Sequence, residues 1–123
     1  MSRIAGTLIA LFLSVAVASA ERPRPLGWAM DAMRNGNWDV AARLAERDGP
    51  VAADVIEWHR LRAGRGAYAD VTAFLNRRPD WPGMALLRRR AEPAVAAAGA
   101  DAVRTFYSAS DPQSPQGILD YAA

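Results

Sequence analysis

Helix-length stretches separated by glycine and proline turns constrain this chain more than any other feature of its sequence. The clearest case is residues 35–66, NGNWDVAARLAERDGPVAADVIEWHRLRAGRG. Apolar side chains recur there at the three- and four-residue spacing of a helix face, first from Trp38 and again from Val51. Gly49 suits the end of one helix, and Pro50 suits the first turn of the next. The stretch therefore predicts two helices joined at a tight corner.

The same design recurs along the chain. Gly-Asn-Trp at 36–38 is followed 30 residues later by Gly-Ala-Tyr at 66–68, and Gly99 opens another helix 33 residues after Gly66. A period of about 30–35 residues with one helix pair per repeat is typical of α-solenoids of the tetratricopeptide type. We therefore predict an all-α protein, a solenoid or superhelix of antiparallel helix pairs with six to seven helices.

Residues 1–20 have the pattern of a signal peptide. Arg3 supplies a positive charge, an apolar run covers 4–17, and Ala-Ser-Ala at 18–20 fits the small-residue cleavage signal. The run is shorter than the roughly 20 residues that a membrane-spanning helix needs. We expect cleavage after Ala20, a periplasmic location and no membrane association afterwards. An uncleaved anchor is the alternative.

Composition predicts one small domain after cleavage. Residues 21–25, ERPRP, are too rich in proline for a helix and should form an extended lead-in to a helical domain at 26–123. The chain has 15 basic residues, Arg3 among them, against 13 acidic ones. A balance so close to neutral excludes the strongly basic class of nucleic-acid-binding protein. Cysteine does not occur, so stability must come from packing without disulfides.

Proline and glycine also mark expected breaks in the second half. Pro93 should kink or end the helix that contains it, because it removes a backbone donor and clashes with the preceding turn. Residues 110–117, SDPQSPQG, have the composition of a loop. The last element, residues 118–123, is apolar without a capping repeat. Solenoids need a capped end to stay soluble, so we expect the helical domain to be incomplete at its C-terminus.

The sequence predicts no catalytic, metal or cofactor site. His59 lies between Ile56 and Ala63 on an apolar row, and no second histidine or cysteine accompanies it, so a core histidine bonded to a backbone carbonyl is the preferred interpretation. Asp54 and Glu57 should share one solvated helix face, whereas glycoside hydrolysis needs carboxyl groups on either side of a cleft. We find no glycine-rich phosphate loop or nucleophile motif, and expect no cofactor.

Two surface features have ordinary structural explanations. Asp39 and Arg43 are spaced to form an ion pair across one helical turn. Four tryptophans could form a sugar-stacking platform, but their places on helix faces and at corners favour packing in the interior. These are Trp28, Trp38, Trp58 and Trp81.

Arginines form the one notable charge cluster. Arg88, Arg89 and Arg90 follow one another, and Arg77 and Arg78 precede the turn at Pro79. Solvated arginines are the simpler interpretation. The sharper hypothesis is contact with an anionic partner, either the acidic peptide stems of a cell-wall polymer or the acidic face of a partner domain.

Two runs of sequence resemble a known family. GNWDVAARLAERDGPVAADVIEWHRLRAG at 36–64, followed by AFLNRRPDWPGMALLRRRAE at 73–92, closely resembles the start of soluble lytic murein transglycosylases from alphaproteobacteria. The resemblance covers about Met33 to Phe106, and GPVAADVIEWHRLRAG and RRPDWPG are its most specific parts. It implies an exported, ring-like or U-shaped superhelix of helices that precedes a lysozyme-like catalytic domain.

The same resemblance implies a function. That family cleaves the bond between N-acetylmuramic acid and N-acetylglucosamine in peptidoglycan and leaves a 1,6-anhydro end, with one glutamate of the C-terminal domain as acid and base. No residue here corresponds to that glutamate. The expectation is therefore a scaffold fragment that positions glycan strands beside a catalytic domain and has no activity alone. A free-standing periplasmic adaptor, tetratricopeptide-like and binding protein or peptide, is the alternative.

Overall fold

The computed structural model describes residues 24–123, which are helical apart from the turns and loops that connect the helices. The predicted signal peptide and residues 21–23 of the predicted lead-in lie outside the described residues. Arg24 is extended as predicted, but Pro25 is already the first residue of a helix. Within them there are seven α-helices and no strand, which confirms the all-α prediction. The helices are α1 (Pro25–Arg34), α2 (Trp38–Glu46), α3 (Pro50–Arg62), α4 (Tyr68–Arg77), α5 (Met84–Ala97), α6 (Ala100–Ala109) and α7 (Pro115–Ala122).

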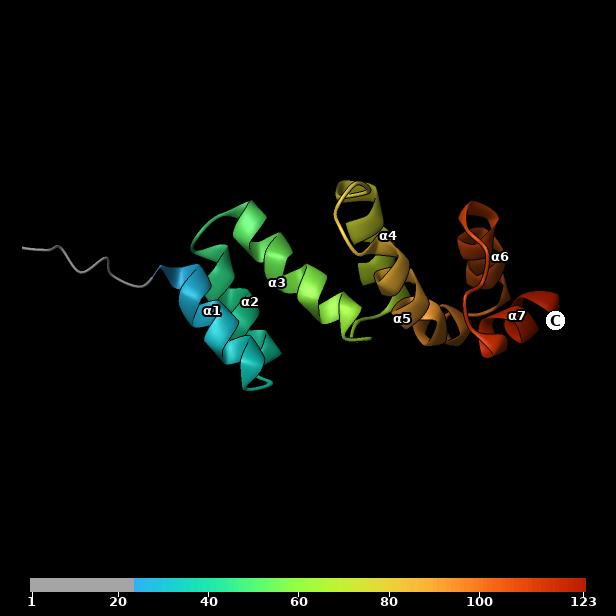
Figure 1. Cartoon of the computed structure of the whole chain (residues 1–123), viewed down its shortest axis with the longest axis horizontal. Helices are drawn as coiled ribbons and strands as arrows, with labels where there is room; N and C mark the ends of the chain where they lie inside the picture. Colours follow the sequence, from blue (N-terminus) through green and yellow to red (C-terminus); the bar gives the residue numbers. More distant parts are fainter. Residues whose placement is uncertain (1–23) are drawn as a thin grey trace, which may run out of the picture.

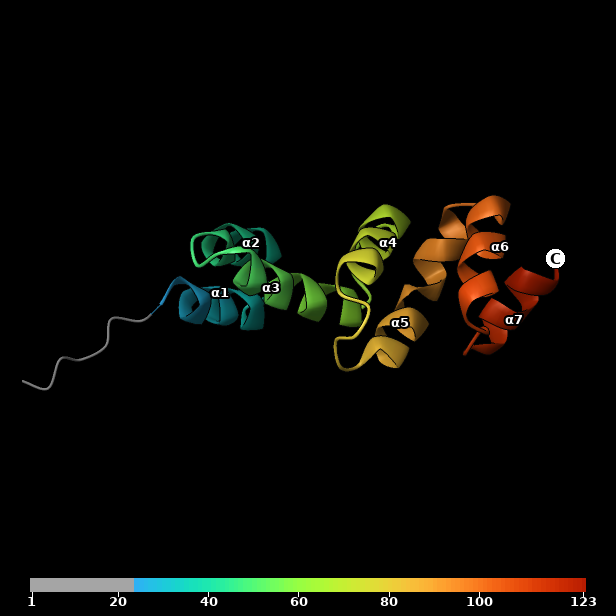
Figure 2. The ribbon, with the colours of Figure 1, turned by 90° about the horizontal axis from the view of Figure 1, so that it is seen from above.

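The helices follow one another along the long axis of an elongated molecule (Figures 1 and 2). Each helix packs against the next one in the chain. In addition, α3 contacts both α1 and α5, and α5 contacts α7. The odd-numbered helices therefore form a continuous row, to which the even-numbered helices are added one by one.

The corner between α2 and α3 is built as the sequence predicts. Gly49 has a backbone φ of 99°, a value that residues other than glycine rarely adopt. Pro50 is the first residue of α3. A second glycine is required at the end of the α3–α4 turn. Gly66 has a φ of 118°, and a Cβ placed on it would lie 2.7 Å from Cδ2 of Leu61.

Two predicted breaks can be compared with the structure. Helix α5 runs through Pro93 without ending, and buried Ala91 and Val95 hold both sides of the proline against the core. The predicted loop at 110–117 is shorter, since α7 begins at Pro115. Ser114 caps this helix, and its Oγ accepts a hydrogen bond from the Gly117 backbone nitrogen at 3.0 Å.

The interior consists of two apolar clusters that α3 joins. The smaller one lies between α1, α2 and α3, and its buried members are Ala29, Ala41, Ala45 and Ile56. The larger one extends from α3 to α6 and contains Leu61, Val71, Phe74, Leu87, Ala91, Val95, Val103, Phe106 and Tyr107. Because α3 contributes Ile56 to one cluster and Leu61 to the other, it is the only described helix with buried side chains in both.

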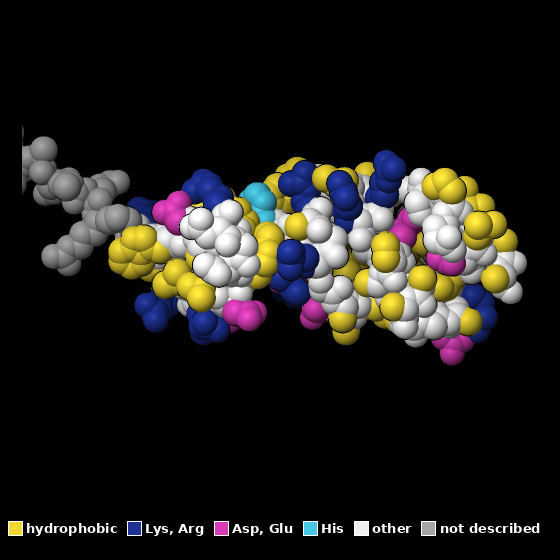
Figure 3. All heavy atoms as spheres, turned by 90° about the horizontal axis from the view of Figure 1, so that it is seen from below, with side chains coloured by type: hydrophobic (Ala, Val, Ile, Leu, Met, Phe, Trp, Pro, Cys, Tyr) yellow, Lys and Arg dark blue, Asp and Glu magenta, His cyan; other side chains and the backbone are white. Residues whose placement is uncertain are grey.

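Some apolar residues expected inside lie on the surface. Trp28, one of the four tryptophans expected to pack in the interior, is 47% exposed, and Val51, which falls on an apolar row of its helix, is 57% exposed. Ile118, Leu119 and Tyr121 are also exposed on α7. Figure 3 shows hydrophobic side chains at the surface over the end of the molecule that holds α6 and α7. The apolar faces of the two end helices are thus only partly covered by the described residues.

Because α3 joins the two clusters, substitutions at a buried and at an exposed position of this helix should differ strongly in their effect on stability. Ile56 is 1% exposed, so Ile56→Ala removes buried methyl groups and should lower the free energy of unfolding by about 2–5 kcal/mol. Val51→Ala, on the exposed side of the same helix, should change it by less than about 0.5 kcal/mol. Urea unfolding followed by circular dichroism measures both, and equal losses would contradict this description of α3.

Candidate functional site

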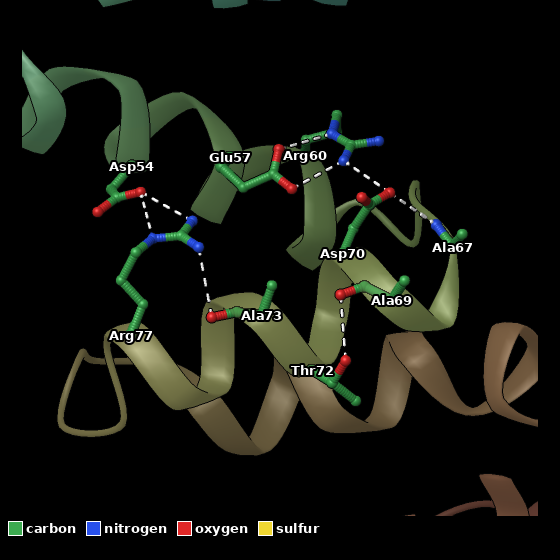
Figure 4. A network of polar contacts seen from close by, with 9 residues as sticks. All are labelled: Asp54, Glu57, Arg60, Ala67, Ala69, Asp70, Thr72, Ala73 and Arg77. Atoms are coloured by element: carbon green, nitrogen blue, oxygen red, sulfur yellow. Dashed lines mark hydrogen bonds and ion pairs between the residues drawn. The ribbon is translucent and has the colours of Figure 1, made fainter.

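The junction between α3 and α4 holds the best-defined polar site of the described residues. Asp54 on α3 is only 5% exposed, and it lies between Arg77 and Arg78 at the end of α4. Figure 4 shows Arg77 beside it. Arg77 donates from Nε to Oδ1 of Asp54 at 2.9 Å, and Arg78 donates from Nε to Oδ2 at 2.7 Å. The sequence-based placement of Asp54 on a solvated face is therefore wrong.

The two arginines decide the charge state of this carboxylate. Burial by itself raises the pKa of Asp54, but the hydrogen bonds and positive charges of Arg77 and Arg78 outweigh that effect and hold the pKa below its ordinary value of 3.8. Asp54 is therefore ionised at neutral pH. A buried carboxylate held by two cations joins helices and has no proton to donate to a substrate.

A second network closes the turn between the same helices. Arg60 donates to both carboxylate oxygens of Glu57, from Nε at 2.8 Å and from an Nη at 2.7 Å, and its Nη also lies 3.2 Å from Asp70 (Figure 4). Asp70 in turn accepts from the Ala67 backbone nitrogen at 3.0 Å, which with Arg60 lowers the pKa of Asp70. Both carboxylates are thus engaged in holding the turn.

Trp58 links α3 to the loop before α5. Its indole Nε1 donates to the Pro82 carbonyl at 2.8 Å, and its ring meets Trp81 edge to face at 6.3 Å between centroids. The guanidinium of Arg62 lies over the Trp58 ring, 4.2 Å from the centroid, in a cation–π contact. Gly83 leaves room for it, because a Cβ there would lie 2.9 Å from Arg62 Nε.

His59 is half-buried, which differs from the core position that the sequence favours. Its ring lies edge to face against Trp58 at 4.8 Å, and within residues 24–123 it makes no hydrogen bond to a backbone carbonyl. Burial lowers the pKa of His59, and the charges of Arg62 and Arg34 lower it further. No group of three acidic, histidine or cysteine side chains in residues 24–123 is arranged to hold a metal ion.

The five arginines of the predicted anionic contact differ in their partners. Arg77 and Arg78 are paired with Asp54, and Arg88 donates to Ser110 Oγ at 3.1 Å with its guanidinium over Phe106. Arg89 and Arg90 are exposed and make no ion pair among the described residues. They line an open groove of about 550 Å³ together with Ala63, Gly64, Leu86, Pro93 and Ser114.

A buried glutamate near the C-terminus was not predicted. Glu92 on α5 is 4% exposed and accepts hydrogen bonds from the backbone nitrogens of Gln113 and Ser114, at 2.6 and 3.1 Å, and from Ser114 Oγ. These bonds fix the segment that leads into α7. Burial, followed by the charges of Glu92 and Asp120, raises the pKa of nearby Tyr107 to about 12. No local sequence signal marks Glu92, because its partners lie more than 20 residues away.

The chain was compared with known protein families, curated proteins and solved structures. No family model, curated protein or solved structure matches this chain. Among residues 24–123, none of the helices has the length and apolar character required to cross a membrane.

The ion pairs of Asp54 should make the stability of the protein depend on pH. Asp54→Asn should lower the free energy of unfolding at pH 7 by about 1–3 kcal/mol, because the arginines lose their charged partner. Since the folded-state pKa is depressed, the contribution of Asp54 is complete above its ordinary pKa and is lost as the pH falls through the lower folded value. The difference between wild type and variant should therefore shrink between about pH 5 and pH 2.

Chemical denaturation across that pH range measures the effect, and Asp111→Asn is the matched control at an exposed position. A difference between wild type and Asp54→Asn that stays constant down to pH 2 would contradict the ion-pair assignment.

The Trp58 hydrogen bond can be tested separately. Trp58→Phe keeps an aromatic ring but removes the donor to Pro82, and should cost about 0.5–1.5 kcal/mol of stability. Trp28→Phe changes an exposed tryptophan in the same way and should have little effect. Thermal unfolding of both variants gives the comparison; equal shifts in Tm would show that the indole donor is unimportant.

Proposed function

We propose that this chain is a helical scaffold of the kind that precedes the catalytic domain in soluble lytic murein transglycosylases. In this proposal it is exported to the periplasm, contacts peptidoglycan and positions glycan strands for a separate catalytic domain. It performs no cleavage of its own.

The observation that carries the proposal is the contact between the two most specific runs of the resemblance. GPVAADVIEWHRLRAG at 49–64 forms α3 with its flanking residues, and RRPDWPG at 77–83 forms the end of α4 and the following loop. Asp54 and Trp58 of the first run bind Arg78 and Pro82 of the second. The residues that carry the likeness thus form one packed unit, and its contacts join helices.

The order of helix contacts supports a solenoid. In an α-solenoid each repeat contacts its neighbours, and the stack grows in one direction. The row of α1, α3, α5 and α7, with the even-numbered helices added beside it, follows that scheme. We therefore interpret the fold as an α-solenoid of helix pairs, tetratricopeptide-like in its repeat length.

Arg89 and Arg90 are the residues that we assign to the murein contact. Both are exposed, neither has an acidic partner among the described residues, and both line the groove beside the end of α3. Guanidinium groups bind carboxylates with two parallel hydrogen bonds. The acidic peptide stems of murein would supply such carboxylates.

A free-standing periplasmic adaptor is the second candidate. A solenoid fold is as compatible with an adaptor as with a murein scaffold, because stacked helix pairs form extended binding surfaces for peptides and proteins. The two candidates differ in their ligand: the scaffold should bind insoluble peptidoglycan, whereas an adaptor should bind a protein or peptide and leave peptidoglycan in suspension.

Co-sedimentation with purified murein sacculi tests the assignment. Arg89→Gln together with Arg90→Gln should reduce the bound fraction several-fold at low salt, and the difference should fade as salt screens the charges. Arg47→Gln together with Arg104→Gln removes the same charge from exposed positions outside the groove and should bind like wild type. Failure of the wild-type protein to sediment with sacculi would contradict the murein scaffold and favour the adaptor.

A further inference from the structure

The groove that holds Arg89 and Arg90 has apolar as well as charged side chains in its wall. Four of its lining residues fall at positions i, i+3, i+4 and i+7 of α5 and therefore share one face of that helix: Leu86, Arg89, Arg90 and Pro93. Leu86 is 39% exposed, and Pro93 is exposed as well. This face of α5 thus has two cations in its middle and an apolar side chain at each end.

The opposite wall of the groove carries no long side chain. It is formed by Ala63 and Gly64, where α3 ends. A Cβ on Gly64 would lie 3.6 Å from the Arg90 carbonyl oxygen, so the turn runs close to the α5 backbone. Ser114 also lines the groove, but its hydroxyl already donates to Glu92. A ligand in the groove therefore meets mainly the α5 side chains.

Charge distinguishes this groove from another one at the start of α2. Among residues 24–123, no carboxylate lines the α5 groove. The α2 groove also holds arginines without acidic partners, Arg43 and Arg65, but Asp39 lines it too. The predicted ion pair between Asp39 and Arg43 does not form within the described residues. Because an acidic side chain in the wall repels an anion, the α5 groove is the more favourable of the two for an acidic ligand.

The length of the α5 face sets the length of the ligand. A helix rises about 1.5 Å per residue, so Leu86 and Pro93 lie about 10 Å apart along the axis of α5. An extended peptide advances about 3.3 Å per residue. Three such steps, which join four residues, cover the distance. The first and fourth residues then lie beside Leu86 and Pro93, and the two middle residues lie beside the arginines.

We propose that this face of α5 binds a four-residue segment of a murein stem peptide, with carboxylates in its middle and a small apolar side chain at each end. The carboxylates bind Arg89 and Arg90, and the apolar side chains pack against Leu86 and Pro93. The site rests on the proposed murein scaffold, to which it adds Leu86 and Pro93 as the residues that select the peptide.

A blocked alanine–glutamate–glutamate–alanine tetrapeptide tests this preference in solution. NMR titration of the purified protein follows its binding through the amide signals of Gly64 and Ser114. Glutamine in place of both glutamates should weaken the Kd at least about tenfold, because the arginines lose their charged partners. Glycine in place of one alanine should weaken it about fourfold, as expected for one buried methyl group. Equal binding of all these peptides, or no binding of the first, would overturn the proposal.

Variants of the protein test the two apolar ends. Leu86→Gln should weaken tetrapeptide binding several-fold, whereas Leu119→Gln, which changes an exposed leucine outside the groove, should not. Pro93→Gln should also weaken binding several-fold, and it does not endanger the fold, because proline is the least favourable residue inside a helix. Circular dichroism confirms that each variant is folded. Wild-type affinity in both groove variants would overturn the assignment of Leu86 and Pro93.

Competition on sacculi separates this inference from the proposed function. An excess of the glutamate tetrapeptide should release the wild-type protein from sedimented sacculi, and the glutamine tetrapeptide should not. If the protein sediments with sacculi and neither peptide releases it, the peptide site is wrong while the murein scaffold stands. If the protein does not sediment with sacculi at all, the murein scaffold fails and the peptide site fails with it.

Discussion

The structure depends on one helix that belongs to two cores. Ile56 and Leu61 of α3 are each about 1% exposed, yet they lie in different apolar clusters. The smaller cluster is built largely from alanines, which bury little apolar area, so on its own it would provide limited stability. Helix α3 connects the smaller cluster to the larger one. Asp54 binds this helix to α4, and Trp58 binds it to the loop before α5.

The arginines of the described residues differ in whether they hold helices together. Carboxylates and arginines at the α3–α4 junction neutralise each other, so that junction is structural. Arg43 and Arg65 line one groove, and Arg89 and Arg90 line another. None of the four has an acidic partner among residues 24–123.

The sequence predicts features that depend on neighbouring residues and misses those that depend on distant ones. Gly49 and Pro50 define the α2–α3 corner locally, and the structure confirms it. The burial of Asp54 depends on arginines 23 and 24 residues away, and that of Glu92 on a segment 21 and 22 residues away. Pro93 does not end its helix, and Ala91 and Val95 on either side of it are buried in the larger cluster. Of the five arginines that the sequence predicts for an anionic contact, Arg89 and Arg90 are exposed and form no ion pair within residues 24–123.

Native-state hydrogen exchange tests most directly whether α3 unites the two clusters. The backbone amides of Ala45 in the small cluster and Phe106 in the large one are the reporters, since both side chains are buried. If α3 couples the clusters, both amides should exchange through the same global opening, with equal free energies that fall in parallel as denaturant is added. If Ala45 exchanges through an opening of much lower free energy while Phe106 remains protected, the N-terminal helices unfold independently and α3 does not join the two cores.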